Sequence, residues 1–207
     1  MSDYSFFAPW GGGAENWVRA IGKYNPGARK FLEIGSFEGK SATFLLDTVF
    51  QKNSPYELYC VDTWEGGEEH SQSAMPVVES NFDLNIRKSL QQDGHGQFSV
   101  VKLKGISSLV LANLVSAGHA GSFDFLYIDG SHQCPDVLTD LALSFMLSKV
   151  GGIIVCDDYT WFPQIRRGNL LHSPKMAIDS FTNCFWDKVA LTDQGSPGQP
   201  IFVKVAD

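Results

Sequence analysis

Three aspartates and one histidine are the side chains best placed for chemistry, because they directly follow short apolar runs. Asp129 and His132 follow one run, and Asp157 and Asp158 follow the next such run along the chain. Carboxylates held close together raise one another's pKa, and a divalent cation with oxygen ligands removes that conflict. A neutral imidazole can accept a proton near pH 7. The pattern predicts a site for a divalent cation, and turn residues that face water are the alternative.

The second candidate site is a glycine-rich loop with the sequence EIGSFEGKS at residues 33–41. Gly35 and Gly39 allow a ligand to approach the backbone closely, and the helix that follows offers free N–H groups. A nucleoside triphosphate is disfavoured, because a P-loop needs four residues between its glycines and this loop has three. A dinucleotide is disfavoured because Phe37 stands where its motif has glycine. The acidic Glu38 favours a cationic ligand, while a plain strand–turn–helix without a ligand stays open.

These side chains need a sheet to bring them together, and the hydrophobic pattern predicts one. Short apolar runs lie at 31–34, 57–62, 98–103, 123–128 and 153–156, and helical patterns at 14–24, 39–50, 81–92, 107–117, 136–147 and 175–185. Two final runs, 189–192 and 200–205, flank a Gly- and Pro-containing turn that suits a hairpin. The expected fold class is α/β: a doubly wound, mostly parallel seven-stranded sheet, Rossmann-like, with an antiparallel edge hairpin at the C-terminus. Ligands of such sheets bind beyond the carboxyl ends of the strands.

Length and charge narrow the class of protein. The chain has 207 residues and a formal net charge of −7. One domain of this length can bury a full core, so 1–207 is predicted as a single domain, with 1–28 as a helical extension and 63–80 as a candidate lid loop. The acidic balance argues against a nucleic acid or a membrane as partner. Since no signal peptide or long apolar span is visible, we expect a cytoplasmic protein.

These motifs resemble those of the class I S-adenosylmethionine-dependent methyltransferases. The first motif of that family is an acidic residue, one further residue, and then Gly-x-x-x-Gly, which here is Glu33, Gly35 and Gly39. The resemblance implies that Asp62 binds the ribose, although Asp62 could also be a simple turn former. The cofactor-binding residues that the resemblance implies are Glu33, Gly35, Ser36, Phe37, Gly39, Ser41, Asp62, Thr63, Trp64, Ser107 and Asp129. Ser107 could equally be only a helix N-cap.

Within that family, the chain resembles the metal-dependent small-molecule O-methyltransferases of the catechol type and the macrocin type, which acts on sugars. The catechol type has Asp-x-x-Lys after its fourth strand and Asp-Asn after its fifth, where this chain has Asp129 with His132, and Asp157-Asp158. The resemblance implies that Asp129, Asp157 and Asp158 bind a divalent metal, magnesium in that type. It also implies that His132 takes the place of the base, so that His132 and Asp129 are the catalytic pair.

The function implied is methyl transfer from S-adenosylmethionine to a hydroxyl of a small molecule, such as a sugar. A cation would lower the pKa of that hydroxyl, and His132 could take its proton. The alternatives are a non-catalytic binding protein on the same fold and a P-loop-like nucleotide hydrolase. The aromatic residues Phe6, Phe7 and Trp10 could cap the site or contact a neighbouring subunit, so a homodimer stays open.

Overall fold

Seven strands form a single sheet in the computed structural model, which describes residues 4–7, 14–67, 75–161 and 170–207. The strands are β1 (Lys30–Ile34), β2 (Tyr56–Asp62), β3 (Phe98–Lys104), β4 (Phe123–Ile128), β5 (Ser148–Cys156), β6 (Val189–Leu191) and β7 (Ile201–Lys204). Their order is β3-β2-β1-β4-β5-β7-β6. The first five run parallel, while β7 is antiparallel to both β5 and β6. The predicted doubly wound sheet with a C-terminal hairpin at one edge is confirmed.

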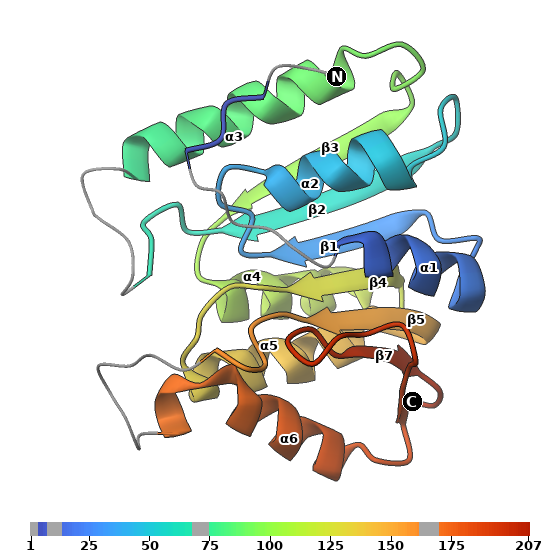
Figure 1. Ribbon diagram of the computed structural model, residues 1–207, viewed down its shortest axis with the longest axis vertical. Helices are drawn as coiled ribbons and strands as arrows, with labels where there is room; N and C mark the ends of the chain where they lie inside the picture. The colour runs from blue at the N-terminus through green and yellow to red at the C-terminus, as the bar shows by residue number, and fades with distance from the viewer. Residues whose placement is uncertain (1–3, 8–13, 68–74, 162–169) are drawn as a thin grey trace.

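Helices cover both faces of the sheet (Figure 1). One face carries α1 (Ala14–Tyr24), α2 (Lys40–Phe44) and α3 (Met75–Leu90), and the other carries α4 (Ser107–Leu114), α5 (Cys134–Leu147) and α6 (Pro174–Cys184). Wider π-helical turns extend α2 over Leu45–Val49 and α4 over Val115–His119, and a short 3₁₀ turn spans Leu170–His172. Among the described helices, none has the length and apolar content that crossing a bilayer requires.

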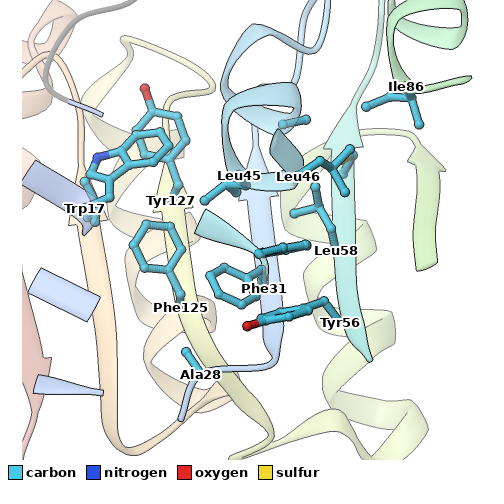
Figure 2. Packing of buried hydrophobic residues seen from close by; sticks show 14 of the residues in the cluster. Trp17, Ala28, Phe31, Leu45, Leu46, Tyr56, Leu58, Ile86, Phe125 and Tyr127 are labelled. Atoms are coloured by element: carbon cyan, nitrogen blue, oxygen red, sulfur yellow. The ribbon is translucent and has the colours of Figure 1, made fainter. Parts of the chain in front are cut away.

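The core beneath the first three helices is rich in aromatic side chains (Figure 2). Trp17 of α1 packs on Tyr127 of β4 with ring centroids 4.4 Å apart, and Phe31 lies 5.4 Å from Phe125 on the neighbouring strand. Full burial of a large apolar side chain contributes roughly 1.5–3 kcal/mol, so these contacts hold α1 firmly on the sheet. The N-terminal helix is thereby joined to the strand that ends beside Asp129.

Strand β4 lies at the centre of the sheet, and all six of its residues are buried. Parallel strands covered by helices on both faces read as continuous apolar runs, which is why this strand was predictable at its observed boundaries. Strand β5 is longer than predicted, because it begins at Ser148. Its pairing with β4 shifts register, since Phe123 pairs with Ser148 while Phe125 pairs with Ile153.

The predicted loop at 63–80 is partly wrong, because α3 already begins at Met75. This segment contains Pro76, and proline is common in loops, but it is also well tolerated in the first helical turn, where its missing N–H has no partner to lose. Residues 68–74 lie outside the described residues, so the lid stays a prediction. In the extension predicted at 1–28, α1 is the helix, and residues 4–7 belong to no helix.

The parallel register brings the carboxyl ends of four strands level with one another. Ile34 of β1 pairs with Val61 of β2 and with Ile128 of β4, and Ile128 pairs with Cys156 of β5. The strand order reverses between β1 and β4, which is the point where such sheets bind ligands. The residues that follow these positions, and that now lie along one edge, are Gly35, Asp62, Asp129 and Asp157.

Candidate active site

A cavity of about 1080 Å³ opens at this edge of the sheet. The predicted site residues that line it are Gly35, Phe37, Asp62, Thr63, Trp64, Ser107, Asp129, His132, Asp157 and Asp158. From the strand order, Asp62 and Ser107 lie on the β2–β3 side of the cavity, while Asp129 and Asp157 lie on the β4–β5 side. The cavity therefore unites the two candidate sites of the sequence. Four predicted residues of the glycine loop stand outside its lining: Glu33, Ser36, Gly39 and Ser41.

Gly35 is required by close packing against the end of β4. Its φ is +87°, and a Cβ at this position would collide with the backbone carbonyl of Asp129. Gly39 has a φ of +77° at the N-terminus of α2. The left-handed region strains residues with a Cβ, so glycine at both positions allows the loop to turn sharply between β1 and α2. The glycine loop that follows β1 thus packs directly against Asp129, the residue that follows β4.

Asp62 is held at the junction of the glycine loop and β2. One carboxylate oxygen accepts the backbone N–H of Phe37 at 2.8 Å, and the other accepts the N–H of Trp64 at 2.7 Å. An ionised carboxylate oxygen has more than one lone pair, so both oxygens can accept further hydrogen bonds from the cavity. The geometry fits both sequence interpretations, because Asp62 shapes the turn and also presents acceptors to a ligand.

Glu33 supports the glycine loop from beneath. Its side chain is fully buried, and the hydroxyl of Ser41 donates to Oε1. For Oε2, the described residues provide no hydrogen-bond partner. Burial raises the pKa of Glu33 to about 7, although the Ser41 hydrogen bond opposes the shift. Glu33 is therefore poised between its neutral and charged forms, behind the cavity wall.

Glu38 does not face the cavity, contrary to the expectation that its charge favours a cationic ligand there. Both of its carboxylate oxygens accept the N–H of Phe7, at 2.8 and 3.0 Å, and Oε1 also accepts the amide of Asn81 at 2.8 Å. These partners come from the N-terminal segment and from α3, which lie on the outer side of the loop. Trp10 lies outside the described residues, and Phe7 has an exposed side chain.

On the β4–β5 side, a hydrogen-bonded chain ends on Asp157. The hydroxyl of Tyr127 lies 2.7 Å from Asp129 Oδ2 and also contacts Asp157 Oδ2. The same oxygen of Asp157 accepts Nε2 of Gln199 at 3.0 Å, and Gln199 Oε1 accepts the indole N–H of Trp17 at 2.8 Å. The other oxygen, Oδ1, accepts the N–H of Asp158 at 2.8 Å. Both carboxylate oxygens of Asp157 are therefore engaged by the protein.

His132 lies between a carboxylate and an aromatic ring. Its Nε2 is 2.7 Å from Asp158 Oδ2, and its ring stacks on Trp161 with centroids 4.1 Å apart. Asp158 adopts a φ of +56°, in the left-handed region. Asp129, His132 and Asp158 each offer one ligand atom, and these atoms lie within 4.8 Å of one another. The close cluster thus contains His132 in place of the predicted Asp157.

This cluster suits a divalent cation. Burial and the charges of Asp157 and Asp158 raise the pKa of Asp129 well above its ordinary range, and burial also raises the pKa of Asp157. A cation between the carboxylates would remove this repulsion, and carboxylate oxygens are the ligands that Mg²⁺ and Mn²⁺ prefer. The donor set of two carboxylates and one imidazole therefore fits a metal, whose presence remains a prediction.

Sequence reasoning missed the residues that hold this site from a distance. Tyr127 was predicted within a buried strand, and Trp17 within an amphipathic helix, but neither carried a signal of contact with the aspartates. Gln199 follows the Gly- and Pro-containing turn and offered no signal. Asp140 lies within the apolar face of α5, and its Oδ2 accepts the hydroxyl of Ser107 at 2.9 Å. For Asp140, a charged residue within the apolar pattern of a helix was a detectable signal.

Residues 32–159 match the sequence pattern of a protein family described as a methyltransferase domain. The chain belongs to this methyltransferase family. The matched region runs from β1 to just beyond Asp158, so it contains the glycine loop, Asp62 and the Asp129–His132–Asp158 cluster. Gln199 and Trp17 lie outside it, although both contribute to the hydrogen-bonded chain at Asp157.

Solved methyltransferases share this fold. The O-methyltransferase TomG from Streptomyces achromogenes, in complex with S-adenosylmethionine, is 17% identical with a TM-score of 0.64, covering 100% of this chain and 84% of its own. An O-methyltransferase from Bacillus cereus, in complex with S-adenosylhomocysteine, is 18% identical with a TM-score of 0.61, covering 99% and 84%. MycE of the mycinamycin biosynthetic pathway, with Mg and S-adenosylhomocysteine, is 16% identical with a TM-score of 0.58, covering 92% and 49%.

A curated relative is an uncharacterized protein of Acanthamoeba polyphaga mimivirus. It is 28% identical over 139 residues, which are 65% of this methyltransferase and 55% of the viral protein. The chain thus spans about half the length of that relative.

Proposed function

We propose that this methyltransferase transfers a methyl group from S-adenosylmethionine to a hydroxyl of a small molecule, with the help of a divalent cation. One observation carries the proposal: a single cavity is lined both by the glycine loop with Asp62 and by the cluster of Asp129, His132 and Asp158. The fold is that of enzymes solved with S-adenosylmethionine or its demethylated product, which supports the choice of cofactor.

The charge of the cavity wall supports a cationic cofactor. S-adenosylmethionine carries a sulfonium and an ammonium group and has no phosphate. Asp62, Asp129, Asp157 and Asp158 line the cavity, and carboxylates there would repel the phosphates of a nucleotide. Asp62 presents two oxygens held in place by backbone N–H groups, which is the acceptor geometry that a ribose diol needs.

The metal would be held by Asp129, His132 and Asp158. A bound divalent cation supplies positive charge that lowers the pKa of an acceptor hydroxyl. Asp157 would act indirectly, since Tyr127 and Gln199 already occupy its Oδ2 and it shares Tyr127 with Asp129. Its role in this proposal is to hold Tyr127, and through it the orientation of Asp129.

His132 has two roles that the geometry supports: metal ligand and acceptor of the hydroxyl proton. Asp158 orients the imidazole through Nε2, and Trp161 stacks on the ring. A positioned base contributes roughly 10²- to 10⁴-fold to a rate, and alignment of the hydroxyl with the methyl group contributes as well. The two roles differ in one respect, which is whether the metal still binds when the imidazole is removed.

Calorimetric titration tests the proposed function directly. We expect S-adenosylmethionine and S-adenosylhomocysteine to bind with micromolar affinity, and ATP to bind far more weakly. Absence of S-adenosylmethionine binding would exclude the proposal, and ATP binding with hydrolysis would favour the nucleotide hydrolase. Binding of S-adenosylmethionine without transfer to any of a panel of sugars, phenols and other alcohols, in the presence of Mg²⁺ or Mn²⁺, would favour the non-catalytic binding protein.

A further inference from the structure

A buried carboxylate beside the cavity has no part in the proposed chemistry. Asp140 is 1% exposed and lies on the buried face of α5 together with Val137 and Leu141. An acid in such a place is costly unless it is hydrogen-bonded. Its Oδ2 accepts the hydroxyl of Ser107 at 2.9 Å, while for Oδ1 the described part of the chain offers no partner. Both Asp140 and Ser107 line the cavity.

Ser107 stands on the same side of the cavity as Asp62. It is the first residue of α4, and it follows the loop in which Gly105 donates its N–H to the carbonyl of Asp62 at 2.9 Å. Ile106, just before it, has a 59% exposed side chain in the cavity wall. The β2–β3 side thus combines the proposed ribose acceptor, an apolar side chain and a hydroxyl, which together suit the nucleoside end of the cofactor.

The contact with Asp140 sets the hydrogen-bonding character of this hydroxyl. A serine hydroxyl has one hydrogen and two lone pairs, and an ionised carboxylate only accepts. The hydrogen of Ser107 therefore points to Asp140, and only lone pairs remain for the cavity. Burial raises the pKa of Asp140 to about 7, so the carboxylate is ionised at pH 8.5.

Donors lie next to this acceptor. The first N–H of α4 that donates to a preceding carbonyl is that of Leu109, which lies 3.1 Å from the carbonyl oxygen of Ile106. The N–H groups of Ser107 and Ser108 precede this bond, and such first-turn groups have no partner within the helix. An acceptor beside donors matches a 6-aminopurine, which offers an amine N–H beside the acceptor N1. In a 6-oxopurine the 6-substituent accepts and N1 donates, so the Ser107 lone pair and the neighbouring N–H groups would both lack partners.

We propose that Asp140 is a positioning residue which makes this methyltransferase select a 6-aminopurine over a 6-oxopurine in its cofactor, by holding the Ser107 hydroxyl as an acceptor. The proposal rests on the proposed function, since it assumes that an S-adenosyl compound binds in this cavity. A site built to pair with a particular N–H discriminates against the analogue that lacks it, because its own polar groups then stay unpaired.

Calorimetry with S-adenosylhomocysteine and S-inosylhomocysteine at pH 8.5 measures this selectivity without any catalytic turnover. We expect the unchanged protein to bind the adenosyl compound about 10- to 100-fold more tightly. Asp140→Asn replaces the obligatory acceptor with an amide that can donate to Ser107, so the ratio should fall to roughly threefold or less. Ser107→Ala removes the acceptor itself and should reduce the ratio in the same way.

Asp187→Asn is the matched control. It makes the same chemical change at an exposed position that does not line the cavity, and should keep the ratio of the unchanged protein. Thermal unfolding of the free proteins shows which variants are folded. If Asp140→Asn does not fold, Ser107→Ala decides the question.

Three negative results are possible, and they distinguish failure of the Asp140 role from failure of the proposed function. A folded Asp140→Asn or Ser107→Ala that keeps full selectivity overturns the role of Asp140. Equal binding of both compounds to the unchanged protein overturns it as well, and leaves the proposed function standing. Binding of neither compound to the unchanged protein overturns the proposed function, and this inference with it.

Discussion

The indole N–H of Trp17 donates a hydrogen bond of 2.8 Å to Oε1 of Gln199, although 182 positions separate the two residues in sequence. This bond settles which end of the Gln199 amide faces the site, because the indole can only donate. The amide Nε2 must then point toward Asp157, where it lies 3.0 Å from Oδ2. An N-terminal helix and the C-terminal hairpin therefore meet at a carboxylate of the candidate active site.

The first prediction concerns this connection. Gln199→Glu keeps an acceptor for Trp17 but replaces the donor to Asp157 with a carboxylate, which repels it. We expect kcat to fall about 10- to 100-fold, because a lost charge-assisted hydrogen bond is worth roughly 1.5–3 kcal/mol, while affinity for S-adenosylhomocysteine changes less than about threefold. Gln51→Glu, an exposed position, is the control. An unchanged kcat in a folded Gln199→Glu would show that the contact does not support the reaction.

The second prediction distinguishes the two roles of His132. A chelator should abolish transfer and Mg²⁺ or Mn²⁺ should restore it, and Asp158→Asn should weaken Mn²⁺ binding about 10-fold or more.

His132→Ala should lower kcat roughly 10²- to 10⁴-fold with little change in cofactor affinity. If the imidazole is a ligand, Mn²⁺ affinity measured by paramagnetic resonance falls with it; if it is the base, that affinity holds. His119→Ala is the control for the histidine variant. For the metal, full activity in the presence of chelator would show that the reaction does not need a cation.

The third prediction uses the pKa of Glu33, which burial raises from 4.5 to about 7. Because the folded state holds this proton more tightly than the unfolded state, the contribution of Glu33 to stability is lost as pH rises from about 4.5 to 7. Glu33→Gln does not ionise, so relative to the unchanged protein it should be about 1–3 kcal/mol more stable at pH 8 than at pH 5. Urea unfolding at both values measures the difference. Exposed Glu57→Gln should show no such trend, and a pH-independent difference for Glu33→Gln would contradict the assignment.

The fourth prediction tests the close packing of the glycine loop on β4. Gly35→Ala places a methyl group against the carbonyl of Asp129 at a φ of +87°, so we expect the free energy of unfolding to fall by about 1–4 kcal/mol. Affinity for S-adenosylhomocysteine should fall as well, since the loop lines the cavity. Gly27→Ala is the matched control, because nothing lies within 4 Å of its added methyl group. Equal stability of the two variants would mean that the loop adapts without strain.

The sequence by itself determined the sheet and the residues at its carboxyl edge. Buried strands such as β4 are apolar at nearly every position, and turn residues such as Gly35 mark where they end, so local pattern alone locates Asp62, Asp129 and Asp157. The order of these runs then predicts a parallel sheet whose strand ends meet. Local pattern was less reliable at Pro76, where one residue type suits both a loop and a first helical turn.

Only the tertiary structure decided which side chains meet at that edge. Glu38 stands outside the cavity lining, where Phe7 and Asn81 donate to it. The close cluster contains His132 and not Asp157, whose Oδ2 contacts Tyr127 and Gln199. Such choices depend on side chains supplied by elements far apart in the chain, and on which hydrogen bonds survive when water is excluded. The periodicity of one segment holds no information about its partners across the sheet.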